Sequence, residues 1–226
     1  MRTKPTTWGA LCLGSVLSFW AGAEAEANRG ELNQASVSEV FMDPPFWQER
    51  AGVYERIQRQ RAILVSVRSQ SHQEHRRLRL QGAGHVRAPK DFAFARAIDF
   101  AELPKVSPHI VEARYNPERS HLFLHTRAFN YHARMLIHLS FPGPQELSSG
   151  QRAIDLQILE GVFAGMRARL LFHPVEDQVT EISLRGFYDY QSFPIPSFFA
   201  SFGLEVVMQR VASRLRQYVE DSYVRG

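Results

Sequence analysis

The feature that most constrains the fold is a succession of strand-like segments that ends in one long amphipathic helix. The alternating segments are residues 110–115, 121–128, 131–141, 154–160, 166–172 and 179–188, with turn residues in the gaps. After Pro196 an apolar stripe recurs at every third or fourth residue, on Leu204, Met208, Val211, Leu215 and Tyr218. Together these patterns predict an α+β fold in which a curved antiparallel sheet wraps around the C-terminal helix.

One hairpin of this sheet has a register that its own pattern fixes. If residues 129 and 130 form the turn, one side of residues 121–138 is apolar and the other is polar, as expected for a half-buried hairpin. The predicted pairs are Thr126–Ala133, Leu124–Met135 and Leu122–Ile137 on the apolar side, and Arg127–His132, His125–Arg134 and His121–His138 on the polar side.

The segments before the sheet core predict an N-terminal hairpin and three short helices. Residues 62–68 and 77–81 are the strands of the hairpin, and Gly82-Ala83-Gly84 indicates a bulge at its end. Residues 46–58 carry apolar side chains at helical spacing and predict a helix that covers the sheet. Pro89 begins two short helices that separate near Phe100.

The first 27 residues have the three regions of a secretory signal peptide. Arg2 and Lys4 precede an apolar run at 8–20, and small residues follow it, with cleavage expected after Ala23, Ala25 or Ala27. The run is shorter than the roughly 20 residues that span a bilayer. We therefore predict export to the periplasm or medium, a polar tail with a short helix over residues 28–60, and a folded domain over residues 61–223.

Charge and cysteine content exclude several classes of function. The formal net charge is +4, and basic residues are spread along the chain rather than gathered in one groove, so no nucleic-acid partner is predicted. Cys12, the single cysteine, lies in the predicted signal peptide. The mature chain is thus expected to have no disulfide, cysteine nucleophile or cysteine metal ligand.

Two groups of motifs resemble a known superfamily. The first reads HVRAPKD at 85–91, IDF at 98–100 and LPKVSPHIV at 103–111; the second reads LEGVF at 159–163 and continues to Tyr188. In combination and order they resemble the polyketide cyclase and coenzyme Q-binding branch of the START-like (SRPBCC) superfamily, over roughly residues 61–223. The resemblance implies a helix-grip fold, with two short helices after an N-terminal hairpin and an apolar cavity under the last helix.

The resemblance leads us to expect a domain that binds a hydrophobic small molecule or lipid without altering it and without a cofactor. The predicted ligand-binding residues are Leu122, Leu124, Met135, Ile137, Met166, Leu170, Ile182 and Leu184, closed by Phe198, Phe199 and Phe202. The aromatic segment 193–199 also suits a transient contact with a membrane. Two alternatives remain open: a cyclase- or hydrolase-type enzyme in the same cavity, and a protein-interaction module whose cavity is filled.

No residue is assigned a catalytic role. Glu160, beside Gly161 at a strand end, is the best acid–base candidate, and Asp155 and Asp189 are weaker ones. The histidines of the 121–138 hairpin fit a solvated outer face better than a metal centre, since no carboxylate completes the set, so no metal site is predicted.

Overall fold

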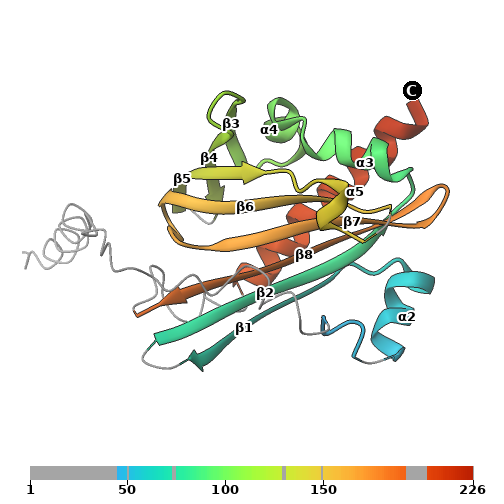
Figure 1. Ribbon diagram of the computed structural model, residues 1–226, viewed down its shortest axis with the longest axis horizontal. Coiled ribbons are helices and arrows are strands. Elements are labelled where there is room, and N and C mark those ends of the chain that lie inside the picture. Colours follow the sequence, from blue (N-terminus) through green and yellow to red (C-terminus); the bar gives the residue numbers. More distant parts are fainter. Residues whose placement is uncertain are drawn as a thin grey trace, which may run out of the picture. The chain divides into compact units, whose positions relative to one another are not determined.

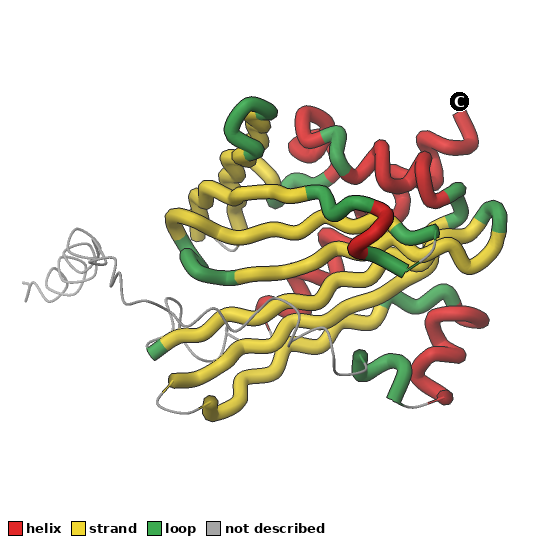
Figure 2. Tube along the Cα trace, viewed as in Figure 1, coloured by secondary structure: helices red, strands yellow, loops and turns green. Residues whose placement is uncertain are grey.

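An eight-stranded antiparallel sheet forms the centre of the described chain, in the order β1-β2-β8-β7-β6-β5-β4-β3. The computed structural model describes residues 45–49, 51–72, 75–128, 131–148, 150–191 and 203–225. The sheet curves, and α5 crosses one face of it (Figures 1 and 2). In chain order the elements are α2 (Ala51–Gln60), β1 (Leu64–His72), β2 (His75–Val86), α3 (Lys90–Ala97), η1 (Phe100–Glu102), α4 (Leu103–Val106), β3 (Ile110–Asn116), β4 (His121–Ala128), β5 (Tyr131–Ser140), η2 (Pro144–Glu146), β6 (Arg152–Gly161), β7 (Arg167–Glu176), β8 (Val179–Tyr190) and α5 (Leu204–Arg225).

This architecture confirms the predicted curved sheet around a C-terminal helix. Each pair predicted for the 121–138 hairpin is present in the β4–β5 ladder. The two short helical regions after Pro89 are also present, as α3 and as η1 continued by α4. The alternating pattern was sufficient to predict the β4–β5 register because only one register buries the whole apolar side of the hairpin.

The main core lies between the inner face of the sheet and the helices α3 and α5. Leu78 from β2, Phe172 from β7 and Val219 from α5 are fully buried in it. A second, smaller cluster lies on the opposite face of the sheet, where Trp47 and Ile57 pack against Ala83. The helix α2 is therefore attached to the outer face of β2, the covering role that the sequence predicts for it.

The helix α5 also occupies the free edge of the sheet. Strand β1 is an edge strand, and side chains of α5 bind its exposed backbone: the Val67 N–H donates to Glu205 Oε1 at 2.7 Å, and Gln209 Nε2 donates to the Ile63 carbonyl at 3.5 Å. An unpaired strand edge is prone to pair with other chains. These two bonds attach α5 to β1 at Val67 and to Ile63, the residue just before the strand.

The structure differs from the sequence prediction at the glycines of β2. No bulge occurs there, since the β2 ladder with β8 is regular through Gly82 and Gly84, and the ladder with β1 is regular up to its end at Ala83. A Cβ built on Gly84 would lie 3.0 Å from Ile63 Cγ1, and one on Gly82 would lie 3.1 Å from the Leu64 carbonyl oxygen. These glycines thus allow a close approach of the neighbouring chain instead of bending the strand.

Candidate functional site

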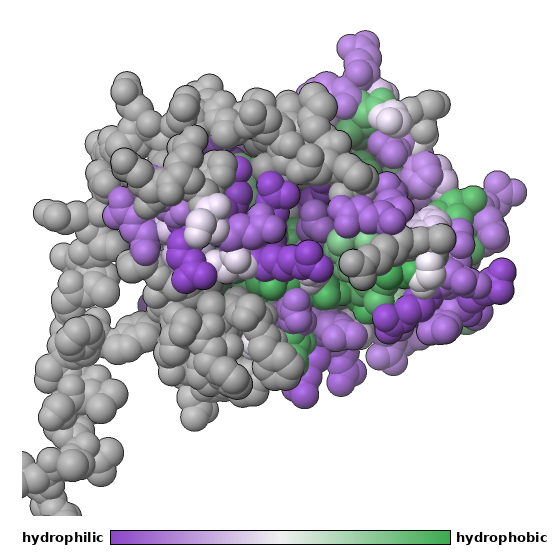
Figure 3. Space-filling model, turned by 90° about the horizontal axis from the view of Figure 1, so that it is seen from below, coloured by the Kyte–Doolittle hydropathy of each residue, from purple (hydrophilic) through white to green (hydrophobic). Residues whose placement is uncertain are grey.

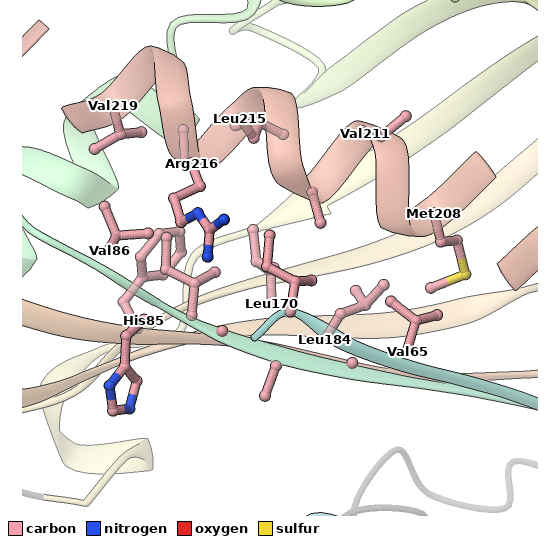
Figure 4. A pocket seen from close by; sticks show the side chains of 18 of the residues that line it. Val65, His85, Val86, Leu170, Leu184, Met208, Val211, Leu215, Arg216 and Val219 are labelled. Atoms are coloured by element: carbon pink, nitrogen blue, oxygen red, sulfur yellow. The ribbon is translucent and has the colours of Figure 1, made fainter. Parts of the chain in front are cut away.

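A cavity of about 280 Å³ lies between α5 and one half of the sheet. Strands β1, β2, β7 and β8 form its floor and α5 forms its roof (Figure 4). Its lining residues are Ile63, Val65, Gly82, Ala83, Gly84, His85, Val86, Ala97, Leu170, Phe172, Ile182, Leu184, Val207, Met208, Val211, Ala212, Leu215, Arg216 and Val219. Nearly all of these side chains are aliphatic, so the cavity offers an apolar surface to a guest.

The space exists because several lining residues have little or no side chain. Along β2, residues 78, 80, 82, 84 and 86 point to the inner face, since successive side chains alternate in a strand. Leu78 and Leu80 fill that face with their own side chains, whereas at Gly82 and Gly84 the side chains of Val65 and Ile63 lie close to the strand, and all four of these residues line the cavity. Ala212 on α5 leaves room from above. Close packing of helix on sheet, the rule in protein interiors, is interrupted at this place.

One end of the cavity carries a group of charged residues. Arg216 reaches from α5 toward the strands beside Val86, while the opposite end at Met208 and Val65 is apolar (Figure 4). Arg216 Nη1 donates to the Arg61 carbonyl at 2.6 Å. The Arg61 guanidinium itself forms an ion pair with Glu220, whose Oε1 also accepts the Arg87 N–H at 2.9 Å.

Burial lowers the pKa of the Arg216 guanidinium; Glu220 acts in the opposite direction and Arg61 reinforces the lowering. An arginine nevertheless keeps its proton at neutral pH, so a partly desolvated positive charge faces the cavity. The apolar stripe predicted from the sequence does not include Arg216. Arg216 follows Leu215, and its long side chain reaches back to the inner face from the edge of the stripe.

His85 lines the cavity with its backbone, and its imidazole points through the other face of the sheet (Figure 4). There His85 Nε2 lies 3.7 Å from Glu181 Oε2, with both side chains buried under α2. Within the described residues, neither of these two atoms has a hydrogen-bond partner. Burial, the charge of Glu181 and a hydrogen bond to its carboxylate raise the pKa of Tyr54 to about 12. This buried polar group belongs to the junction of α2 with the sheet.

The cavity overlaps with only part of the predicted ligand-binding set. Leu170, Ile182 and Leu184 line it. Leu122, Leu124, Met135, Ile137 and Met166 instead belong to the main core, and Phe198, Phe199 and Phe202 lie outside the described residues. The set as a whole stays a prediction. Its emphasis on β4 and β5 followed their clear alternation, whereas the cavity arises from missing side chains on β2.

The acidic candidates lie away from the cavity. Glu160 is exposed on β6. Asp155 accepts two hydrogen bonds from Arg169 at 2.6 and 2.7 Å, and Asp189 accepts two from Arg77 at the same distances. Each of these pairs joins directly opposed residues on neighbouring strands. Asp155 and Asp189 therefore hold strands together through two-pronged ion pairs.

The histidines of β4 and β5 pair across the ladder. His125 Nε2 lies 3.0 Å from His132 Nδ1, and the rings of His121 and His138 are 5.7 Å apart, edge to face. No group of three or more His, Cys, Asp or Glu side chains suited to a metal ion occurs in the part of the chain that the structure describes.

Several solved structures share the architecture of this chain. A START superfamily protein from Mycobacterium smegmatis superposes with a TM-score of 0.52 at 18% identity, over 65% of this chain and 98% of that one. The Zhui aromatase/cyclase from a Streptomyces species gives 0.51 at 12%, over 66% and 94%. The chain has a START-like fold. A STAR-related lipid transfer protein from Xanthomonas axonopodis matches the same START-like domain with a TM-score of 0.50 at 12% identity, over 69% and 98% of the two chains.

These matches confirm the fold that the motifs resemble, and at such identities they concern the fold alone. No protein-family profile matches the sequence, and no curated protein matches it. The narrower resemblance of the START-like domain to the polyketide cyclase and coenzyme Q-binding branch stays a prediction.

The surface of the described residues is mostly polar, with some exposed apolar side chains. Seen from below, polar side chains predominate, and apolar residues show between them in a strip (Figure 3). Large apolar side chains with high exposure include Val111, Phe141, Leu159 and Val224. None of the helices in the described ranges, α5 included, is long and apolar enough to cross a membrane.

Proposed function

We propose that this START-like domain binds a hydrophobic small molecule, or one chain of a lipid, in the cavity under α5 and does not alter it chemically. The observation that carries the proposal is the aliphatic lining of the cavity between α5 and strands β1, β2, β7 and β8. Its volume of about 280 Å³ is close to the lower end of the range of ligand pockets, about 300 Å³. The guest is therefore small: a single acyl chain or a compact ring system.

The alternative of an enzyme receives less support from the cavity. The names of two similar structures include a lipid transfer protein and an aromatase/cyclase, so the fold is compatible with either activity. Acid–base catalysis needs a group that exchanges a proton near neutral pH within reach of the substrate. Of the lining residues, His85 directs its ring to the opposite face and Arg216 keeps its proton. These positions favour binding over chemistry.

Native mass spectrometry of the purified full-length protein, followed by extraction of bound molecules, tests the proposal. A retained apolar molecule at one copy per chain, or binding of added fatty acids, sterols or polycyclic aromatics, is the expected result. A folded protein that neither retains nor takes up any member of this panel contradicts it. A panel member recovered in altered form favours the enzyme instead.

The location of this activity is also a proposal. The sequence of residues 1–27 supports export, and the corresponding test is the mass of the protein recovered from the periplasm of a Gram-negative host. We expect a chain that begins after Ala23, Ala25 or Ala27. An uncleaved chain in the cytosol excludes this part of the proposal.

A transient membrane contact through Phe198 and Phe199 completes the proposal. Its support is the aromatic, proline-edged sequence 193–199 alone. Replacing both phenylalanines with serine is expected to weaken sedimentation with liposomes, and unchanged sedimentation of the folded variant excludes the contact.

A further inference from the structure

The cavity is polar at one end only, and this asymmetry carries information about its guest. The roof residues along α5 run from Val207 to Val219, and Met208 and Arg216 among them are about 12 Å apart at 1.5 Å per residue. At the Met208 end the neighbours are aliphatic, while Arg216 places its guanidinium at the other end, beside Val86 (Figure 4). A guest that matches both ends has an apolar body and a single polar head.

The charge at this end is positive and only partly balanced. Arg61 and Arg216 contribute two guanidinium groups, and Glu220 contributes one carboxylate. Glu220 is already occupied, because it pairs with the Arg61 side chain and accepts the Arg87 backbone N–H. Among the described residues, Arg216 has one acceptor, the Arg61 carbonyl, and forms no ion pair.

A guanidinium that is half-buried without a carboxylate partner is costly, since burial of a charge is compensated only by a counter-charge or by full hydrogen bonding. A carboxylate on the guest supplies both. Its two oxygens match the planar fork of an arginine, which has five N–H donors and uses only one of them here for the Arg61 carbonyl.

We propose that the guest is an anionic amphiphile, a monocarboxylate whose head binds Arg216 and whose apolar chain extends under α5 toward Met208. This inference rests on the proposed binding function and specifies its ligand class. At about 30 Å³ per water-sized group, a cavity of about 280 Å³ accommodates on the order of nine or ten non-hydrogen atoms, the size of octanoate.

The test compares octanoate with 1-octanol, which has the same chain and an uncharged head, by calorimetric titration of the full-length protein at neutral pH. Octanoate is expected to bind the wild-type protein more tightly by about tenfold or more, because the charged head forms a charge-assisted pair and the hydroxyl does not. This comparison needs no variant, so it holds whether or not a substitution at position 216 is tolerated.

Three variants test whether the preference for octanoate depends on Arg216. Arg216→Met keeps an unbranched apolar stem and removes the charge; it should abolish the preference for octanoate and change the octanol affinity by less than about twofold. Arg214→Met, at an exposed position of the same helix, is the matched control and should leave both affinities unchanged. Arg216→Lys retains the charge and should keep part of the preference.

The outcomes separate this inference from the function on which it rests. Equal affinities of the wild-type protein for octanoate and octanol overturn the anionic guest and leave the apolar cavity standing. A preference for octanoate that persists in folded Arg216→Met overturns the assignment of Arg216. If neither compound binds and no other apolar molecule does, the proposed function itself fails. If Arg216→Met does not fold, the wild-type comparison and Arg216→Lys decide.

Discussion

Gly161 occupies a position at which the backbone leaves no room for a side chain. Its φ of +92° lies in the left-handed region, and a Cβ there would lie 1.9 Å from the Arg134 carbonyl oxygen. The register between β5 and β6 also shifts here, with Glu160 opposite Leu136 and Ile158 opposite Ile137. The close approach of Gly161 to β5 therefore belongs to this irregular part of the ladder.

We expect Gly161→Ala to destabilise the domain by about 3 kcal/mol or more, because backbone strain and a clash with a carbonyl add. Gly165 is the matched control: its φ is +94°, and no atom lies within 4 Å of a Cβ built on it. Gly165→Ala should cost only the strain, about 1 kcal/mol. Urea unfolding measures both, and equal losses would mean that the Arg134 contact does not matter.

Tyr54 makes the stability depend on alkaline pH. Burial, then the charge of Glu181 and the hydrogen bond to it, raise its pKa from 10.0 to about 12. An unfolded tyrosine loses its proton near pH 10, while the folded one keeps it until about pH 12. The stabilising contribution is therefore complete below pH 10 and disappears as the pH rises toward 12.

Tyr54→Phe should remove this contribution, so the difference in unfolding free energy between wild type and variant should shrink between pH 10 and 12. Solvent screening at this half-buried site limits the change to about 1 kcal/mol. Other tyrosines titrate in both proteins and cancel in the comparison. A difference that stays constant over the whole range contradicts the coupling of Tyr54 to Glu181.

At the scale of elements, the sequence predicts a strand register where polar and apolar residues alternate. It does not predict the course of a strand where glycines interrupt that alternation. The β4–β5 register followed from the sequence because a slip by one residue would expose the apolar side. The straight course of β2 through Gly82 and Gly84 did not, since a glycine pattern is compatible with a bulge and with a close approach. Those glycines line the cavity, and only the three-dimensional pairing of β1 with β2 shows that Ile63 and Val65 lie close to them there.

The helix α2 provides the prediction at this scale. Its Ile57 is fully buried against the outer face of the sheet, next to Trp47 and Ala83. We expect Ile57→Ala to lower the free energy of unfolding by about 2–4 kcal/mol, through lost burial and the cavity left behind. Gln58→Ala, at an exposed position of the same helix, should have little effect.

Unfolding of the wild-type protein, followed by two signals, tests where the domain begins. The predicted boundary at residue 61 leaves α2 outside, and nothing in the fold decides that boundary. In a chain cleaved after the predicted signal peptide, Trp47 is the only tryptophan. Its fluorescence follows α2, whereas circular dichroism follows the sheet and α5. Coincident unfolding curves for both signals include α2 in the domain, and separate curves support the boundary at 61.

At the scale of the whole molecule, the cavity interrupts the close packing of the core, and the proposed binding function makes use of this space. Helix and sheet elsewhere share a dense core, while the space beneath Ala212 remains open. Under the proposed function, a ligand at one hundred times its dissociation constant adds about 2.7 kcal/mol to the free energy of unfolding. For a chain of this size that corresponds to a rise in Tm of roughly 5–10 °C.

A larger side chain inside the cavity should separate the stability of the free protein from the stability that a ligand adds. Ala212→Leu adds three carbons to the lining, and at about 0.8 kcal/mol per buried methylene it should stabilise the free protein by up to about 2 kcal/mol. The same side chain occupies the site, so the rise in Tm on addition of octanoate should fall below about 2 °C. Gln217→Leu, exposed on the same helix, should retain the full rise. If Ala212→Leu retains it too, the ligand binds elsewhere, because a guest and a leucine cannot both occupy the space beneath position 212.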